Sequence, residues 1–376
     1  MNSYKHICSK VLRLHLCTSF MVLVRVVLLG IITVGTVLAG ITACNKVEEV
    51  VTVKQNLEIK MDIRQKAATD PSKPMVWPIE REIESLQILV FNYAGKIEAY
   101  YNSADLSNGL DINQPITMSI LTGSKTIVAL ANFDDMRAIR SYDELLSTPF
   151  ELADNDINNN RKLLMSGITK CVLNASAPTS VNISLERMVS RIVLRQLYNA
   201  LPLMYKNMTI QSVMLTNVPL NAHIVNNMYE TDVLLNYSGR DDYGYEIIDG
   251  DYALAYAPGI TFKMVNKIVQ CHNGYDFSNT VNLYTYPNTI TIDTQGDIET
   301  YLPKKTRLVI TAIIDNVKCY YPITLDELEP NVSYYIDVII RSPGVSDPEE
   351  PLSKDPIQIT LESKPYSTGY DYIENI

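Results

Sequence analysis

A long alternation of apolar and polar residues constrains this chain more than any other feature. Between Val51 and Ile63 the apolar side chains occupy one parity, apart from Gln55, and the polar ones occupy the other. A period of two over this length is typical of a β-strand with one buried face. Further short strands are expected at 83–92, 96–101, 127–132, 171–173, 181–185, 189–197, 208–215, 233–236, 281–285, 289–292, 307–314, 333–340 and 357–361. Many short strands separated by turns predict an all-β protein built of sandwiches.

Two segments depart from this pattern. Ser141-Tyr142-Asp143-Glu144 is a capping-box sequence and predicts a short helix over 141–146. Asp154–Asn160 is a polar loop whose acids begin like a calcium-binding loop. Its sixth position is Asn159 where that loop needs Gly, and its twelfth is Met165 where it needs Glu, so no calcium site is expected.

The N-terminal region has the pattern of an export signal. Residues 1–20 carry cations and no acids, and 26–40 form a nearly continuous apolar run. That run is shorter than the roughly 20 residues that a membrane-spanning helix needs. Small residues and a cysteine follow, in Ile41-Thr42-Ala43-Cys44. We therefore expect residues 1–43 to be a lipoprotein signal peptide, cleaved between Ala43 and Cys44, with lipid (palmitate) on Cys44.

Alternatives to this interpretation are an ordinary secretory signal and an uncleaved anchor. Met21 is an alternative translation start to Met1. A chain that begins at Met21 keeps a compact signal with the single cation Arg25. Lys46-Val47-Glu48-Glu49 places acids directly after the anchor, which is similar to the export signal of surface lipoproteins in some Gram-negative bacteria.

Charge and cysteine content exclude two classes of protein. Lys and Arg number 32 against 42 Asp and Glu, for a net charge of −10, which argues against a nucleic-acid partner. After the signal and Cys44, only Cys171, Cys271 and Cys319 remain, and three thiols cannot all pair. A disulfide framework is therefore not expected.

Catalytic signatures are missing from the sequence. His223 and His272 are the only histidines after the signal, and no HExxH, GxSxG, P-loop or GxGxxG pattern occurs. The acids of 241–242 and 249–251 could serve glycoside hydrolysis, but nothing in the sequence positions them for it. We expect no catalytic residue, no metal site and no cofactor, and therefore no enzyme.

Several short motifs occur in an order that resembles the fimbrillin family, the subunits of type V pili of anaerobic Gram-negative bacteria. These motifs are Ile83–Asn92 (IESLQILVFN) with Gly95-Lys96, Lys125–Asn132 (KTIVALAN), Leu164–Gly167 (LMSG), Ser184–Val193 (SLERMVSRIV), Leu215–Pro219 (LTNVP), Leu283–Asn288 (LYTYPN), Leu328–Tyr335 (LEPNVSYY) and Ser342–Pro351 (SPGVSDPEEP). The C-terminus departs from the family pattern, because a Tyr-rich extension follows 357–361 where a Val-rich strand with a closing Trp is common.

The resemblance implies two transthyretin-like β-sandwich domains in tandem after the lipoprotein signal. The best boundary lies near Arg187, which gives an N-terminal domain at 44–187 and a C-terminal domain with an extension at 188–376. The resemblance also implies assembly by strand exchange after a trypsin-like, Arg-specific protease cuts near the N-terminus.

Arg64 fits such a cleavage site, because it ends the alternating strand and precedes a Pro-rich loop. A cut between Arg64 and Gln65 would free the strand and empty a groove that a neighbour's strand can fill. The apolar residues of the displaced strand are Leu57, Ile59, Met61 and Ile63. The alternatives are that this strand is permanent and that Arg64 is an ordinary surface cation.

Two C-terminal segments could donate the replacing strand. The first contains Ile357, Ile359 and Leu361, and it could equally be the last strand of its own domain. The second is the extension with Tyr370, Tyr372 and Ile376.

The expected function is that of a structural stalk or anchor subunit of a fimbrium, which supports cell adhesion from the outer membrane surface. Its partners would be other pilus subunits, the Arg-specific protease, and the outer membrane through the lipid on Cys44. The alternative is a pilus-tip or surface lipoprotein adhesin that binds glycan or host protein through Tyr-rich loops such as Tyr237–Tyr256.

Overall fold

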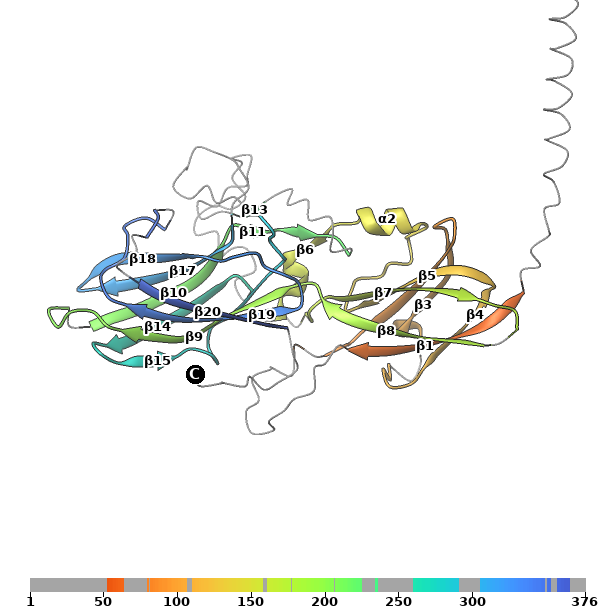
Figure 1. Cartoon of the computed structure of the whole chain (residues 1–376), viewed down its shortest axis with the longest axis horizontal. Coiled ribbons are helices and arrows are strands. Elements are labelled where there is room, and N and C mark those ends of the chain that lie inside the picture. The colour runs from red at the N-terminus through yellow and green to blue at the C-terminus, as the bar shows by residue number, and fades with distance from the viewer. Residues whose placement is uncertain are drawn as a thin grey trace, which may run out of the picture. The chain divides into compact units, whose positions relative to one another are not determined.

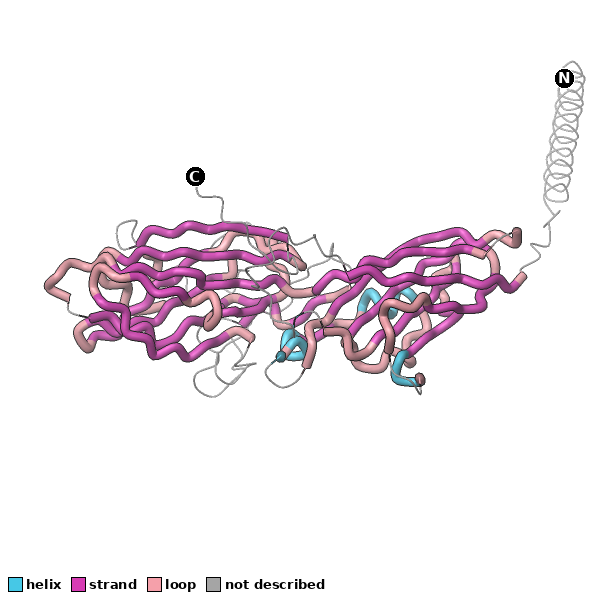
Figure 2. Tube along the Cα trace, turned by 90° about the horizontal axis from the view of Figure 1, so that it is seen from below, coloured by secondary structure: helices cyan, strands magenta, loops and turns pink. Residues whose placement is uncertain are grey.

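The structure is a computed structural model, and strands make up most of it (Figure 2). It describes residues 53–63, 80, 82–106, 110–157, 161–176, 178–205, 207–224, 234–235, 260–290, 305–348, 350–352 and 357–365. Within these ranges, no helix is both long enough and apolar enough to cross a membrane.

Seven strands of the N-terminal half pair in the order β3-β2-β5-β7-β8-β1-β4 (Figure 1). Their bounds are β1 (Lys54–Ile63), β2 (Leu86–Asn92), β3 (Ile97–Asn102), β4 (Ile116–Leu121), β5 (Gly123–Ala131), β7 (Met165–Leu173) and β8 (Thr179–Arg187). The run folds over on itself, because β7 and β8 pair only at Met165 with Arg187 and at Ser166 with Glu186. Strands β3, β2, β5 and β7 thereby form one face of a sandwich, and β8, β1 and β4 form the other.

One hydrophobic cluster fills the space between these two faces. Many of its buried members come from alternate positions of β1, β2, β5 and β8, as a period of two requires: Leu57, Ile59, Leu86, Ile88, Val90, Ile127, Ala129, Ile183 and Leu185. Ile120 of β4 and both Met165 and Leu173 of β7 belong to the same cluster. The sandwich core therefore depends on β1 as much as on the strands in the middle of the chain.

Gly167 marks the corner where β7 meets β8. A Cβ atom at this position would lie 2.4 Å from the backbone oxygen of Ser184 and 2.8 Å from a methyl group of Ile183. Only glycine permits so close an approach of the two strands. This explains the glycine of the LMSG motif.

The strands of the C-terminal half form two main sheets. One has the order β14-β10-β17-β18 and the other β15-β9-β19-β20, with β16 also paired to β9. Their bounds are β9 (Ser190–Asn199), β10 (Asn207–Thr216), β14 (Phe262–Gln270), β15 (Gly274–Asp276), β16 (Asn282–Thr285), β17 (Arg307–Ile314), β18 (Val317–Thr324), β19 (Val332–Ile340) and β20 (Ile357–Pro365). Short strands β6 (Phe150–Glu151) and β12 (Asn221–Ala222) pair with each other, as do β11 (Val218–Pro219) and β13 (Leu234–Leu235).

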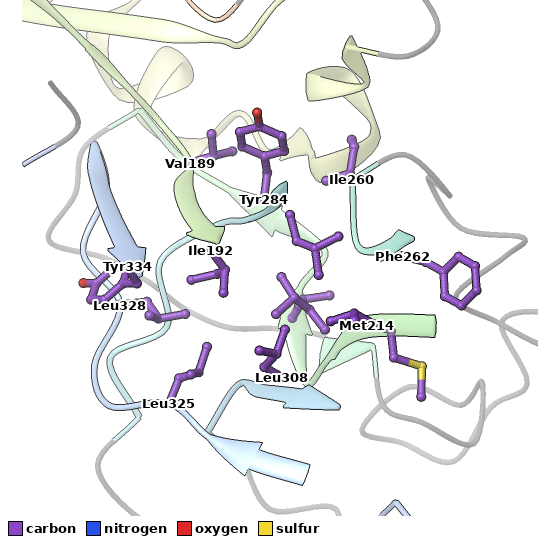
Figure 3. Packing of buried hydrophobic residues seen from close by; sticks show 14 of the residues in the cluster. Val189, Ile192, Met214, Ile260, Phe262, Tyr284, Leu308, Leu325, Leu328 and Tyr334 are labelled. Carbon is purple, nitrogen blue, oxygen red and sulfur yellow. The ribbon is translucent and has the colours of Figure 1, made fainter. Parts of the chain in front are cut away.

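A second hydrophobic cluster fills this half and continues into the N-terminal half. Figure 3 shows part of it, to which Ile192, Tyr284 and Leu308 contribute from different strands. The same cluster includes Leu89 and Phe91 from the outer face of β2. Both faces of β2 are therefore buried, which agrees with its unbroken apolar sequence.

Helix α2 (Tyr142–Ser147) covers part of that outer face. It begins as its sequence predicts, with the Ser141 side chain accepting a hydrogen bond from the Glu144 backbone. Leu145 is buried, and the Tyr142 ring lies 5.4 Å from the Phe91 ring. Short 3-10 helices also occur in the described residues, among them η2 (Ser103–Asp105) and η3 (Leu152–Asn155).

The prediction of an all-β fold is confirmed, and several of its details need correction. Strands β4, β14 and β18 were not expected, and the 3-10 turn Leu152–Asn155 overlaps the start of the loop expected at Asp154–Asn160. Thr289 and Ile290 lie outside any strand, while the remainder of that expected strand falls outside the described ranges. The boundary at 187/188 and the transthyretin-like character stay predictions.

Candidate functional site

Strand β1 lies inside its sheet rather than at an edge. Lys54 to Ile59 pair antiparallel with Leu121 to Ile116 of β4. Leu57 to Ile63 pair parallel with Thr179 to Leu185 of β8. Its backbone groups therefore form ladders on both sides, and its removal would leave two strand edges unpaired.

The two faces of β1 differ sharply in burial. Leu57 and Ile59 are both 0% exposed, and Met61 packs against the same cluster. On the other face, Lys60 and Glu58 form a 3.3 Å ion pair with side chains 54% and 40% exposed. Burying each aliphatic side chain stabilises the fold by about 1.5–3 kcal/mol, whereas the exposed pair contributes about 0–1 kcal/mol. The apolar face thus holds the strand in place.

Strand β4 depends on β1 for its ladder. Among the strands with assigned residues, β4 pairs only with β1. Outside that ladder, the Leu121 backbone donates to Oε1 of Glu98 at 2.7 Å. Oε2 of Glu98 lies 2.7 Å from Nζ of Lys125, and both side chains are nearly buried. One end of β4 would therefore stay tethered if β1 left.

A buried ionic cluster fixes the chain just before β2. Glu80 lies 3.1 Å from Nη1 of Arg191, with their side chains 0% and 2% exposed. The hydroxyl of Tyr284 also donates to the Glu80 carboxylate. The Glu80 backbone oxygen accepts from Nε of Arg187 at 2.9 Å. Glu80 thereby ties this segment to β8, β9 and β16.

The polar residues of the fimbrillin-like motifs meet in space. Arg187 donates to the Asn331 side chain at 3.3 Å, and Asn331 has a positive φ of 56° in the turn before β19. The Asn288 side chain donates to the Asn217 backbone oxygen at 3.3 Å and to the Thr306 hydroxyl at 3.0 Å. These hydrogen bonds join polar residues of several motifs, at the end of β8 and in turns, that lie far apart in the sequence.

Strand β20 lies at the edge of its sheet and pairs antiparallel with β19 over nine positions. Ile359 is 40% and Leu361 is 37% exposed, so its apolar side chains are poorly covered. Glu362 lies 2.9 Å from Arg195, which also binds Asp337 at 2.6 Å. Hydrogen bonding to Asp337 raises the pKa of the Arg195 guanidinium above its ordinary value.

The structure describes only some of the residues that were predicted to form the site. Leu57, Ile59, Met61 and Ile63 share strand β1, while Ile357, Ile359 and Leu361 share β20, paired with their own chain's β19. Outside the described residues lie Ala43, Cys44, Arg64, Gln65, Tyr370, Tyr372, Ile376 and the whole loop 237–256. Processing and strand donation therefore stay predictions.

Cys271 and His272 lie in the turn between β14 and β15, where the Cys271 thiol donates to the Leu201 carbonyl. No cluster of His, Cys, Asp or Glu that could hold a metal ion occurs among the residues the structure covers.

The buried charges were not expected from the sequence. Arg187, Arg191 and Arg195 recur every four residues through an otherwise apolar segment. Since a buried arginine needs an acidic or hydrogen-bonding partner, this spacing indicated such partners without identifying them. The structure identifies the acids as Glu80 for Arg191, and Asp337 with Glu362 for Arg195.

Comparisons with known proteins agree with this architecture. The family described as "Major fimbrial subunit protein (FimA)" matches residues 56–221. No curated protein sequence matches the chain. A crystal structure of a fimbrilin from Porphyromonas gingivalis W83 is similar, with a TM-score of 0.56, 13% identity, and coverage of 84% of this chain and 99% of that one.

Two crystal structures of putative cell adhesion proteins are also similar. The one from Bacteroides eggerthii has a TM-score of 0.55 and 17% identity, and it covers 83% of this chain and 96% of that one. The one from Parabacteroides distasonis has a TM-score of 0.53 and 14% identity, with coverage of 84% and 100%. At these identities the likeness concerns the fold.

Proposed function

Because residues 56–221 of this chain match the family described as "Major fimbrial subunit protein (FimA)", we propose that it is a structural subunit, a stalk or an anchor, of a surface fimbrium that supports adhesion. It is exported as a lipoprotein through Cys44 and joins other pilus subunits by strand exchange. An Arg-specific protease cuts between Arg64 and Gln65 and releases β1. Its role is structural rather than enzymatic.

The observation that carries this proposal is the position of β1. The strand is an interior member of its sheet, yet it lies at the N-terminal end of the sandwich, next to the candidate cleavage site. Its loss would expose the ladder edges of β4 and β8 and uncover the core beside Leu57 and Ile59. An incoming strand would restore both ladders, at a net of about 0.5–1.5 kcal/mol per hydrogen bond, together with the apolar burial.

Association costs reduce the affinity that this burial provides. The many contacts must all break before the strand can leave, so dissociation is slow and the polymer is kinetically stable. The position of Glu80 supports the same scheme, because its buried ion pair holds the segment after the cut to the rest of the chain. Cleavage would then release β1 and leave the remaining strands in place.

N-terminal sequencing of fimbriae sheared from cells tests this proposal. Chains that begin at Gln65 are expected for a stalk subunit. An Arg64→Ala variant should remain unprocessed, with Lys66→Ala as its neighbouring control. If the surface form is always the intact lipidated chain, processing at Arg64 is refuted and the anchor role is favoured.

A further inference from the structure

Strand β20 is weakly held where it lies. It pairs with β19 alone among the described strands, and so has one ladder where β1 has two. Ile359 and Leu361 lie opposite Val338 and Ile336, both fully buried core residues. Ile357 packs against the core cluster, but Ile359 and Leu361 remain 40% and 37% exposed, so apolar burial holds β20 less firmly than it holds β1, where Leu57 and Ile59 are fully buried.

A charged side chain from a more distant strand compensates for this weak burial. Arg195 belongs to β9, and β19 lies between β9 and β20. Its guanidinium binds Asp337 of β19 through two nitrogens at 2.9 Å and 2.6 Å. Nη1 reaches Glu362 of β20 at 2.9 Å, and the group lies over the Tyr335 ring at 5.8 Å. Arg195 therefore crosses one strand to hold the next.

The same residue pattern occurs in β20 and in β1. Ile357–Glu362 reads IQITLE and Leu57–Asp62 reads LEIKMD. Aliphatic or Met side chains alternate with polar ones at matching positions, and both segments end in an acid. A strand with this pattern can lie between β8 and β4 with its apolar side chains directed into the core, as β1 does.

We propose that β20 is a stored strand, that Arg195 latches it to β19 through Glu362, and that opening this latch limits the rate at which a second copy receives β20 in the place of β1. This inference rests on the strand exchange proposed above and adds to it the means of control. Transfer replaces one ladder by two and buries the half-exposed aliphatic side chains. The Arg195–Glu362 contact opposes transfer until it breaks.

Removing the charge of Glu362 tests the latch. In Glu362→Gln, the backbone amides of 357–364 should exchange with solvent about five-fold faster in the unprocessed monomer, the factor that about 1 kcal/mol supplies. Polymer growth after treatment with an Arg-specific protease, followed by light scattering, should accelerate by a similar factor. Asp143→Asn, which removes an exposed acid from α2, is the matched control and should change neither rate.

Unchanged amide exchange in Glu362→Gln would overturn the latch. Faster exchange with unchanged growth would show that β20 release does not limit assembly, which also overturns the proposal.

A reversible crosslink provides the second test. Ile339 and Gln358 lie directly opposite each other in the antiparallel β19–β20 pair. Opposite Cα atoms in such pairs are about 4.5–5.5 Å apart, within the range of a disulfide. The double variant Ile339→Cys/Gln358→Cys should fail to polymerise when oxidised and recover when reduced. Ile339→Cys alone is the control and should polymerise in both states.

Growth of the oxidised double variant at the control rate would show that β20 is not the transferred strand. If processed wild-type chains also polymerise in that experiment, the proposed strand exchange stands, with the extension that contains Tyr370, Tyr372 and Ile376 as the donor. Processed wild-type chains that never polymerise, or that retain β1 in the polymer, would instead refute the proposed function. The failure of the latch and the failure of strand exchange are therefore distinguishable.

Discussion

Two ion pairs of nearly equal length should differ several-fold in their effect on stability. Glu80 and Arg191 lie 3.1 Å apart with almost no exposure, while Glu58 and Lys60 lie 3.3 Å apart and are largely solvated. Because water screens the exposed pair, Glu58→Gln should change the free energy of unfolding by about 0–1 kcal/mol. Glu80→Gln leaves the buried Arg191 charge without its carboxylate and should cost about 3–5 kcal/mol.

Urea unfolding at neutral pH measures this difference. Glu80→Ala should cost still more, because it also removes the acceptor of the Tyr284 hydroxyl, worth about 1–3 kcal/mol. The double variant Glu80→Gln/Arg191→Met removes both members of the pair and should recover part of the loss. If Glu80→Gln and Glu58→Gln lie within about 0.5 kcal/mol of each other, burial does not govern these pairs and the reasoning is wrong.

Three further outcomes are expected from the fold. Ile59→Ala should lower the free energy of unfolding by about 2–5 kcal/mol while the exposed Lys60→Ala stays within about 0.5 kcal/mol, and equal effects in urea unfolding would show that β1 is not part of the core. Gly167→Ala should cost about 1–3 kcal/mol by thermal unfolding, since its Cβ meets the Ser184 backbone, and an unchanged melting temperature would refute that contact. Burial and the Asp135 hydrogen bond raise the pKa of Tyr100 to about 12. The unfolded tyrosine ionises near 10, so stability should fall between pH 10 and 12, less so in Tyr100→Phe; identical pH profiles for the two proteins would contradict this.

The predictability of each strand follows from its local regularity. The long alternation of β1, broken only at Gln55, identified it from sequence alone. Strand β14 was not recognised because Asn266, at a φ of 47°, interrupts its period of two. Strand β18 contains Pro322, which usually argues against a strand. It is tolerated here because β18 is the last strand in its sheet order.

The buried charges were less accessible to sequence reasoning than the strands. Glu80 and Arg191 are separated by 111 positions along the chain. No local pattern reports a contact over that distance, so only the arginine half of the pair could be recognised. The role of the candidate donor segment 357–361 was ambiguous for a related reason. An edge strand of its own domain and a strand donated to a neighbour have the same alternation of apolar and polar residues.

The mixed pairing of β1 fixes the chain direction of any strand that takes its place between β4 and β8. β1 runs parallel to β8 and antiparallel to β4, so a replacement laid in backwards would meet the wrong bonding geometry on both sides. Under the proposed exchange, every subunit would therefore face the same way. Because the giving and receiving surfaces of a subunit differ, successive joints need not close into a ring, and the fibre would grow with two unlike ends.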